Sequence, residues 1–232
     1  MKLSSLKSST LVDQVCSALA QELRSEIEQG DGWLPPEREM ALKLGVSRTV
    51  LREAAKRLEL QGLIEIKHGI GIRAVDHLHK PLSGSLSLLL PDMADRLQQL
   101  MEARLLIEPE IARLAALRAS EAQLASLAEC HLTLEAAQGH EQAVLADIEF
   151  HRQLARLSGN EVLALLLESL SELGRASRQL TIGNVGKERA LRHHAAILQA
   201  VTQRQPEQAA QAMRQHVAQA IDDMELQKNQ TR

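Results

Sequence analysis

The chain has 232 residues, which is enough for one large or two modest domains that each bury a core. Hydrophobic residues make up 44% of it but aromatic residues only 1%, so the core must be aliphatic, which favours helices packed on helices. Such a shortage of aromatic rings argues against an RNA or single-strand binder, because bases stack on such rings. The net charge of -3 excludes no class of partner.

The first residues and the two cysteines indicate a cytoplasmic protein. MKLSSLKSST is polar and lacks the apolar segment of a secretion signal, and the most apolar run of the chain is too short to span a bilayer. Cys16 and Cys130 are isolated in the sequence, which predicts two buried free thiols instead of a disulfide. We therefore expect a cytoplasmic protein that has no membrane partner.

Residues 1–76 predict a small domain of three helices and a β-hairpin. Apolar residues recur at helical spacing in three segments, and Ser47 is placed as the N-cap of the third. The residues that mark the ends of these helices are Gly30, Pro35, Pro36, Gly45 and Gly62. In LIEIKHGIGIRAV, apolar and polar residues alternate around Gly69 and Gly71, which predicts a short hairpin.

The second and third helices with the hairpin predict a winged helix-turn-helix that reads double-stranded DNA. Basic residues outnumber acidic ones between Arg38 and Arg73. The first turns of a reading helix enter the major groove, where an arginine donates two bonds to guanine, and a glycine-tipped hairpin can approach the minor groove. The expected DNA contacts are Arg38, Ser47, Arg48, Thr49, Arg52, His68 and Gly69. The alternative is a solvated charged face on a protein-interaction domain.

The segment LPPEREMALKLGVSRTVLREAAKRLELQGLIEIKHGIG resembles the signature of GntR-family transcription regulators. The resemblance covers about residues 10–75. It implies contacts with operator DNA by Arg38, Arg48, Arg52, His68 and Gly69. It also implies a homodimer on a palindromic operator. The sequence departs from the signature at Pro36, at Ala55 and in the wing ending GIRAV, which affects only the expected wing contacts.

Residues 77–92 predict a linker, because proline, glycine and serine interrupt the pattern there. Residues 93–232 show no strand pattern and predict an antiparallel bundle. The predicted helices span 93–118, 121–137, 141–157, 161–180, 187–203 and 206–227. The expected fold is mainly α, with an N-terminal winged helix-turn-helix and a C-terminal antiparallel bundle of six to seven helices.

Asp147 and His151 lie one helical turn apart in ADIEFHRQLARLSGN, an arrangement that suits a metal ion. His194 and His216 fall on the inward stripes of two other predicted helices. A single inward histidine is more typical of a satisfied core residue, but burying four such groups without partners is costly. One metal ion would satisfy all four. We expect one divalent transition metal per chain, either Zn, Ni, Mn or Fe(II).

The same residues resemble the metal-binding FCD effector domain of the FadR-like branch of the GntR family. The positions that match its ligand pattern are Asp147, His151, His194 and His216. His193 is then a neighbour of the metal site. Arg104, in MEARLLIEPEIARLAA, resembles the arginine at the head of that domain, and its planar fork suits a carboxylate. The resemblance implies a small organic-acid effector on the metal and Arg104; the alternative for Arg104 is a salt bridge to Glu108.

The predicted function is a homodimeric regulator, a repressor by resemblance, whose operator affinity changes when a carboxylate binds. Three alternatives remain: a regulator that senses the metal itself, a member that needs the metal only for folding, and a metallohydrolase. A hydrolase needs a general base near the metal, but Glu149 lies on the opposite side of the helix from Asp147 and His151. The sequence also contains no H-E-x-x-H motif. We therefore predict a regulator and not an enzyme.

Overall fold

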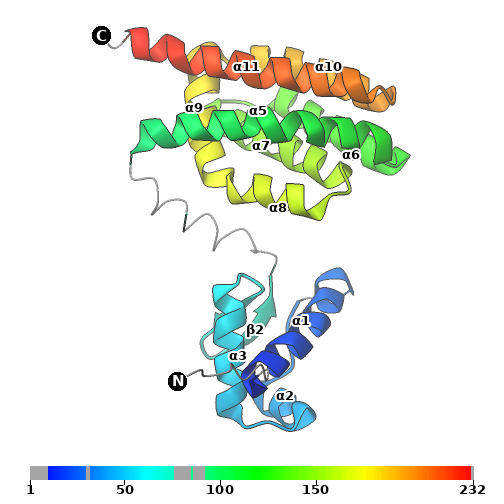
Figure 1. Ribbon diagram of the computed structural model, residues 1–232, viewed down its shortest axis with the longest axis vertical. Helices are drawn as coiled ribbons and strands as arrows, with labels where there is room; N and C mark the ends of the chain where they lie inside the picture. Colours follow the sequence, from blue (N-terminus) through cyan, green and yellow to red (C-terminus); the bar gives the residue numbers. More distant parts are fainter. Residues whose placement is uncertain (1–9, 30–31, 76–84, 86–91, 231–232) are drawn as a thin grey trace, which may run out of the picture. The chain divides into compact units, whose positions relative to one another are not determined.

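The computed structural model describes residues 10–29, 32–75, 85 and 92–230. The chain divides into two compact units, Met1–Gly84 and Ser85–Arg232. In Figure 1 the first unit contains a pair of strands, and the elements drawn for the second are all helices. The linker predicted over residues 77–92 lies almost entirely outside the described residues.

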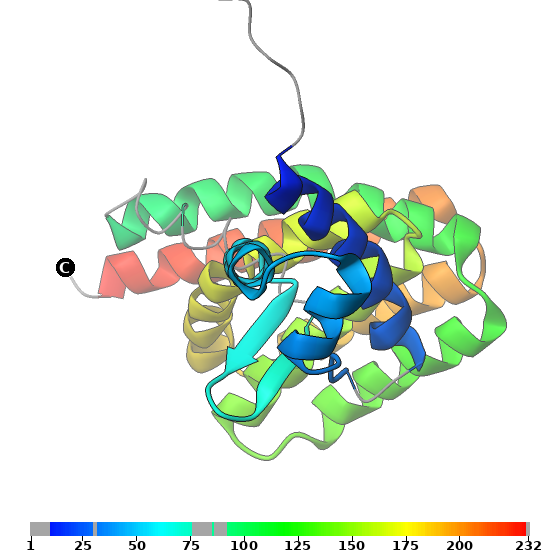
Figure 2. The same cartoon turned by 90° about the horizontal axis from the view of Figure 1, so that it is seen from below.

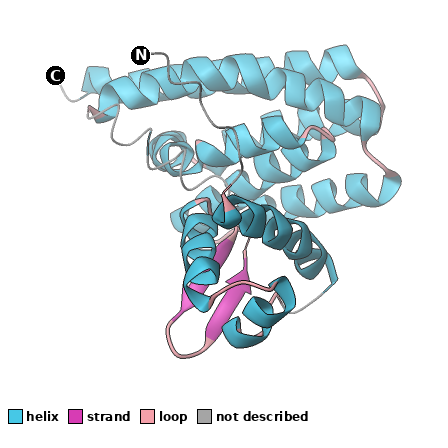
Figure 3. Ribbon diagram, turned by 60° about the horizontal axis from the view of Figure 1, so that its bottom comes forward, coloured by secondary structure: helices cyan, strands magenta, loops and turns pink. Residues whose placement is uncertain are grey.

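The first unit is a three-helix domain with a hairpin, as the sequence predicts. Its elements are α1 (Leu11–Gln29), α2 (Glu37–Leu44), α3 (Arg48–Leu60), β1 (Ile64–Lys67) and β2 (Gly71–Ala74). The two strands are antiparallel, with Ile66 opposite Ile72, and appear in magenta in Figure 3. Gly45 ends α2 in the left-handed conformation, with φ of 64°. Ser47 Oγ accepts a hydrogen bond from Val50 N at 3.2 Å and caps α3.

The core of the first unit is aliphatic, and the single tryptophan of the chain lies at its edge. The core side chains include Val15, Leu19, Leu23, Met40, Leu51, Leu58, Ile64 and Ile72. Trp33 forms an isolated bridge with Arg73, and Lys67 Nζ lies 5.9 Å from the centre of the indole ring. Trp33 thus joins the segment before α2 to the hairpin.

The second unit contains seven described helices. They are α5 (Met93–Arg118), α6 (Glu121–Ala136), α7 (His140–Leu157), α8 (Glu161–Ser169), α9 (Ser171–Val185), α10 (Lys187–Thr202) and α11 (Pro206–Gln230). In Figures 1 and 2, α5 and α11 run side by side, and α10 lies against α11. The mainly α fold with a bundle of six to seven helices is confirmed. No helix among the described residues combines the length and apolar character that crossing a membrane requires.

The single helix predicted over residues 161–180 is wrong, because the chain turns at Leu170 between α8 and α9. In Figure 1 these two helices run in different directions. The Ser169 hydroxyl donates a hydrogen bond to Leu165 O at 2.7 Å, and such a bond from a serine side chain competes with the helix ladder and bends it. The turn sets the direction of α9, which lies against α7.

The core of the second unit consists of alanine and branched aliphatic side chains around one aromatic ring. The fully buried residues include Ile111, Ala112, Ala115, Leu127, Leu154, Ile197, Val201, Met213 and Val217. Phe150 is the aromatic member and is completely buried. Cys16 and Cys130 are free thiols in the two units, but both are half-buried, so the expectation that they are buried was wrong.

Candidate metal centre and nucleic-acid interface

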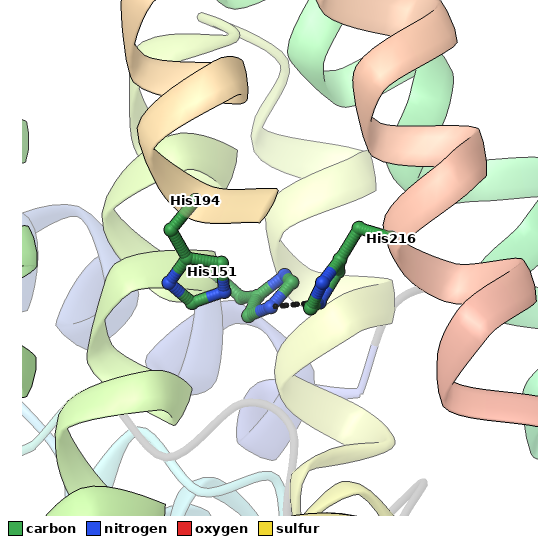
Figure 4. A group of neighbouring side chains, drawn as sticks. All are labelled: His151, His194 and His216. Atoms are coloured by element: carbon green, nitrogen blue, oxygen red, sulfur yellow. Dashed lines mark hydrogen bonds between the residues drawn. The ribbon is translucent and has the colours of Figure 1, made fainter. Parts of the chain in front are cut away.

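Three histidines from three helices meet inside the second unit. His151 comes from α7, His194 from α10 and His216 from α11, and their rings face one another in Figure 4. One ligand nitrogen from each lies within 4.8 Å of the other two, and Nε2 of His151 is 3.2 Å from Nε2 of His216. Nitrogen ligands about 2.1 Å from an ion lie roughly 3 Å apart. The spacing therefore suits a single metal ion.

Asp147 adds a carboxylate to this group. It precedes His151 by one turn of α7, so both side chains leave the same face of the helix. Its Oδ1 lies 3.3 Å from Nε2 of His194, and its Oδ2 lies 3.7 Å from Nε2 of His151. The four residues that the sequence singled out as metal ligands thus lie together, and none is more than 7% exposed.

His194 is positioned by stacking. Its ring lies parallel to that of Phe150, with the centroids 4.0 Å apart and an angle of 10° between the planes. Among the residues that the structure describes, neither ring nitrogen of His194 has a hydrogen-bond partner. A buried polar atom without a partner costs about 1–3 kcal/mol. The neutral ring therefore has a nitrogen lone pair that is free to bind a metal ion.

His194 and His216 are held in the form that binds metals. Burial lowers the pKa of His194 to about 3, and it also holds the pKa of His216 well below its usual value. Both rings are therefore neutral at pH 7, with a lone pair available. Three imidazoles and one carboxylate are a donor set typical of a divalent transition metal, so the residues present fit such an ion.

Glu108 is a member of this cluster that the sequence analysis considered only as a partner of Arg104. Its Oε1 accepts a hydrogen bond from Arg104 Nε at 2.5 Å. Its Oε2 lies 2.7 Å from Nδ1 of His151, although the two atoms are poorly aligned for a hydrogen bond. Burial alone would raise the pKa of Glu108, but the charge of Arg104 holds it well below its usual value. Glu108 thus lies beside Nδ1 of His151, whereas Asp147 lies nearer Nε2.

Arg178, on α9, is a functional candidate that the sequence analysis missed. Its Nε donates a short hydrogen bond to Oδ2 of Asp147, and its Nη1 donates to Gly174 O at 3.2 Å. The side chain is only 8% exposed. Burial alone would raise the pKa of Asp147, but the Arg178 charge holds it below its usual value. The sequence predicts residues 161–180 as one helix, so it does not indicate that α9 has an inward face of its own. Arg178 lies on this face between Ser177 and Thr181.

Two pockets flank the cluster, and Arg104 and Arg178 line both. One has a cavity volume of about 20 Å³ and reaches Glu108 and His151. The other has a cavity volume of about 30 Å³ and reaches Asp147 and His216. The second pocket has further polar lining from Thr181, Arg189, His193, Gln219 and Asp223. His193 is half-buried in its wall, with its ring centre 5.7 Å from that of His216.

The seven residues predicted to contact DNA are all exposed on the first unit. One groove is lined by Arg38 of α2, Arg48 and Arg52 of α3, and His68 and Gly69 of the hairpin turn. Ser47 and Thr49 lie at the start of α3 but outside this groove, and the Ser47 hydroxyl is engaged in capping. Arg52 Nε donates to Glu37 Oε2 at 2.8 Å.

Comparison with known proteins gives two family matches. The family described as "Bacterial regulatory proteins, gntR family" matches residues 11–73, and the FCD domain matches residues 99–219. The Uxu operon regulator of Haemophilus influenzae is 31% identical over 221 residues, which cover 89% of this chain and 80% of that protein. The Glc operon transcriptional activator of Escherichia coli K12 is 31% identical over 218 residues, covering 88% and 86%.

Further likenesses extend over most of the chain. The transcriptional repressor NanR of Citrobacter rodentium is 28% identical over 215 residues, which cover 89% of this chain and 82% of that protein. Among solved structures, Streptococcus agalactiae GntR is 31% identical, with a TM-score of 0.72, and the likeness covers 90% of this chain and 98% of that chain.

Proposed function

The chain belongs to the GntR family of bacterial regulators and carries an FCD domain, and from this we propose that it is a metabolite-responsive repressor. In this proposal the FCD domain binds one divalent metal ion and a small carboxylate effector that changes operator affinity. The observation that carries it is the convergence of Asp147, His151, His194 and His216 on one buried point.

Asp147, His151, His194 and His216 would hold the ion. When bound, the metal supplies positive charge and open coordination positions for an oxygen of the effector. Glu108 would fix the orientation of His151, and Phe150 would fix that of His194. Whether the ion is Zn, Ni, Mn or Fe depends on its coordination geometry and supply.

Arg104 and Arg178 would bind the effector, because both line the two pockets beside the cluster. A guanidinium group matches a carboxylate with two parallel hydrogen bonds. The Arg104–Glu108 salt bridge, which the sequence left as the alternative role for Arg104, is compatible with effector binding. Glu108 engages Nε and Met101 Sδ accepts from Nη1 at 3.6 Å, and the remaining N–H groups of the guanidinium would donate to an effector.

The DNA-binding domain would comprise residues 1–76, the linker residues 77–92 and the effector domain residues 93–232. A homodimer would place two α3 helices in successive major grooves of a palindromic operator, in the cytoplasm and on the nucleoid. An effector that prefers one arrangement of the dimer shifts the population towards it, and a tenfold change in DNA affinity needs only about 1.4 kcal/mol. We propose that the effector lowers operator affinity and so relieves repression.

The first test is the metal content of protein purified without added metal, determined by elemental analysis. We expect about one ion per chain in the wild type and none after His194→Ala. His193→Ala is the matched control, because His193 is adjacent in sequence but lies outside the group of four, and it should retain the ion. A wild type that is empty and also rejects added Zn, Ni and Mn would contradict the metal site.

A second measurement separates an acid sensor from a metal sensor. Operator affinity is measured before and after chelation, without any organic acid. In the proposed function, the metal anchors the effector, so small carboxylates change operator affinity only in the metal-loaded protein. If chelation alone abolishes or restores operator binding and carboxylates have no effect, the protein is a metal sensor instead.

A further inference from the structure

The basic groove of the first unit also contains acidic side chains. Among the described residues that line it, Glu37 and Glu59 stand beside Arg38, Arg48, Arg52, Lys56 and Lys67. An acid beside a phosphate backbone weakens DNA binding, because much of the affinity comes from neutralised phosphates. Both acids are bonded within the unit: Glu59 Oε1 accepts from Ile66 N at 3.0 Å, and Glu37 Oε2 accepts from Arg52 Nε at 2.8 Å. Glu59 thus ties the hairpin to α3, and Glu37 ties an arginine of α3 to α2.

The backbone fixes the position of Glu37. It is the first residue of α2 and follows Pro35 and Pro36, of which Pro36 has a φ of -54°. Proline restricts φ, and the dipole of a helix stabilises a carboxylate at its first turn. The Glu37 side chain is 30% exposed, whereas that of Arg52 is 63% exposed. Glu37 is therefore the fixed partner of the pair, and Arg52 is the partner that it holds.

Arg48 and Arg52 lie one turn apart on α3, but only Arg52 is held in this way. Arg48 is exposed, and it makes no hydrogen bond or ion pair with any residue that the structure describes. An arginine that is free in solution loses rotamer freedom when it binds a base, and this ordering opposes binding. For Arg52, the bond to Glu37 has imposed part of that order before DNA arrives.

The bond to Glu37 also selects which part of the Arg52 guanidinium faces a base. A guanidinium can offer two parallel N–H donors from its Nε side or from its Nη1 and Nη2 end. Glu37 accepts from Nε, so the Nη1 and Nη2 end remains for DNA. Guanine presents two acceptors in the major groove, O6 and N7, which match two donors, whereas adenine presents one acceptor and one donor. An Arg52 held by Glu37 is thus suited to guanine.

We propose that Glu37 is a positioning residue for operator recognition: it holds Arg52 so that the Nη1 and Nη2 end reads one guanine. Without Glu37, the Arg52 side chain is free to turn to a phosphate, a contact that carries no sequence information. The Glu37 charge weakens binding to all DNA, and the gain is discrimination between sequences. This inference rests on the proposed function, because it presupposes that α3 enters the major groove.

The test uses the full chain and a duplex selected by the wild-type protein, in which each guanine is replaced in turn by 7-deazaguanine. This base lacks the N7 acceptor but still pairs with cytosine. The guanine that Arg52 reads is the one whose replacement weakens binding of the wild type but not of Arg52→Ala. Fluorescence anisotropy should show a loss of about fivefold in wild-type affinity at that guanine.

Three variants then test Glu37. In Glu37→Ala the loss at that guanine should shrink to about twofold or less, while affinity for an unrelated duplex rises because a negative charge is gone. Glu37→Gln, whose amide oxygen still accepts from Nε, should keep the guanine preference and also bind the unrelated duplex more tightly. Glu39→Ala is the matched control: Glu39 lies on the same helix, pairs with Lys43 and does not line the groove. It removes the same charge and should keep the preference.

The outcomes separate this inference from the proposed function. A wild type that binds every duplex equally overturns the proposed function and this inference with it. If the wild type is selective but Arg52→Ala responds to every replacement as the wild type does, the inference alone fails. It also fails if Glu39→Ala loses the preference as Glu37→Ala does. A role confined to joining α2 to α3 would lower the Tm of Glu37→Ala and leave its guanine preference intact, which would equally refute the inference.

Discussion

The two units of the molecule use charged side chains in opposite ways. In the winged-helix unit, Arg52 pairs with Glu37 while its side chain remains 63% exposed. In the FCD unit, Arg104 and Glu108 pair with exposures of 3% and 1%. An exposed ion pair contributes about 0–1 kcal/mol, whereas removing one partner of a buried pair costs about 3–5 kcal/mol. We therefore expect that replacing an exposed charged residue of the first unit can change DNA binding without changing stability. Replacing a buried charged residue of the second unit should change both ligand binding and stability.

The largest expected effect comes from Glu108→Ala. It leaves Arg104 as an unpaired buried cation, and the free energy of unfolding of the second unit should fall by about 3–5 kcal/mol. Scanning calorimetry of the metal-free chain measures this. Glu110→Ala is the control on the same helix, because Glu110 pairs with Arg113 at the surface, and it should cost less than about 1 kcal/mol. Equal losses in the two variants would remove the contrast between buried and exposed pairs.

Acid should destabilise the two units unequally. The pKa of His194 is about 3 in the folded protein, and that of His216 is also lowered, while an unfolded histidine titrates near 6.5. Below about pH 6.5 the unfolded chain binds protons that the folded chain does not, so stability falls as pH falls. The metal-free second unit should lose roughly 2 kcal/mol from His194 by pH 5, and His216 should add to this loss.

The carboxylates of the cluster extend this loss to lower pH. The pKa values of Asp147 and Glu108 are lowered in the folded protein, so they stabilise it above their unfolded pKa values of about 4, and this contribution disappears on further acidification. In the first unit, every titratable side chain that the structure describes is at least partly exposed. Unfolding transitions recorded from pH 7 to pH 4 test the contrast, and parallel losses in both units would contradict it.

In the first unit, Arg48→Ala should change binding without changing stability. Loss of a bidentate contact to guanine costs about 1–3 kcal/mol of DNA affinity, while an exposed substitution stays within about 0.5 kcal/mol of unfolding free energy. Fluorescence anisotropy with a labelled duplex selected by the wild-type protein measures the affinity. Lys43→Ala, an exposed change on α2 outside the groove, should leave affinity nearly unchanged. A loss of stability in Arg48→Ala as large as its loss of affinity would make the first unit resemble the second.

The smallest effect is expected for Phe150→Leu, which removes the ring that stacks on His194. The stacking contributes about 0.5–1.5 kcal/mol, so zinc should bind several-fold more weakly. Leu157→Val is a control in the same helix and the same core, and it should lower stability without changing zinc affinity. Calorimetric zinc titration of both variants measures the difference. Equal zinc affinities in the two would mean that stacking does not position His194.

The sequence predicted the first unit closely because its signals are local. Gly45 ends one helix, Ser47 caps the next, and two glycines bound the hairpin turn, each within a few residues of the structure it determines. The turn at Leu170 carried no such signal, since it contains neither glycine nor proline. It depends on a serine side chain bonding back to the helix and on the packing of α9 against α7.

For the candidate site, helical periodicity selected the three histidines and Asp147 as inward-facing residues. It gave no reason to place Arg178 inside, because a charged residue at helical spacing normally indicates a solvated face. Glu108 was recognised as a neighbour of Arg104 but not as a neighbour of His151. These contacts join helices that are distant in the sequence, so they are identified only from the packed structure.

Trp33 is an intrinsic fluorescence probe of the winged-helix unit. It is the only tryptophan, and the chain has no tyrosine, so intrinsic fluorescence comes from the winged-helix unit alone. The indole lies near the cationic ends of Lys67 and Arg73, and its emission should respond when a phosphate backbone draws those charges away. The FCD unit contains neither tryptophan nor tyrosine and does not contribute to this emission. A change in emission caused by a ligand of α5 to α11 would therefore record directly the passage of a signal from one unit to the other.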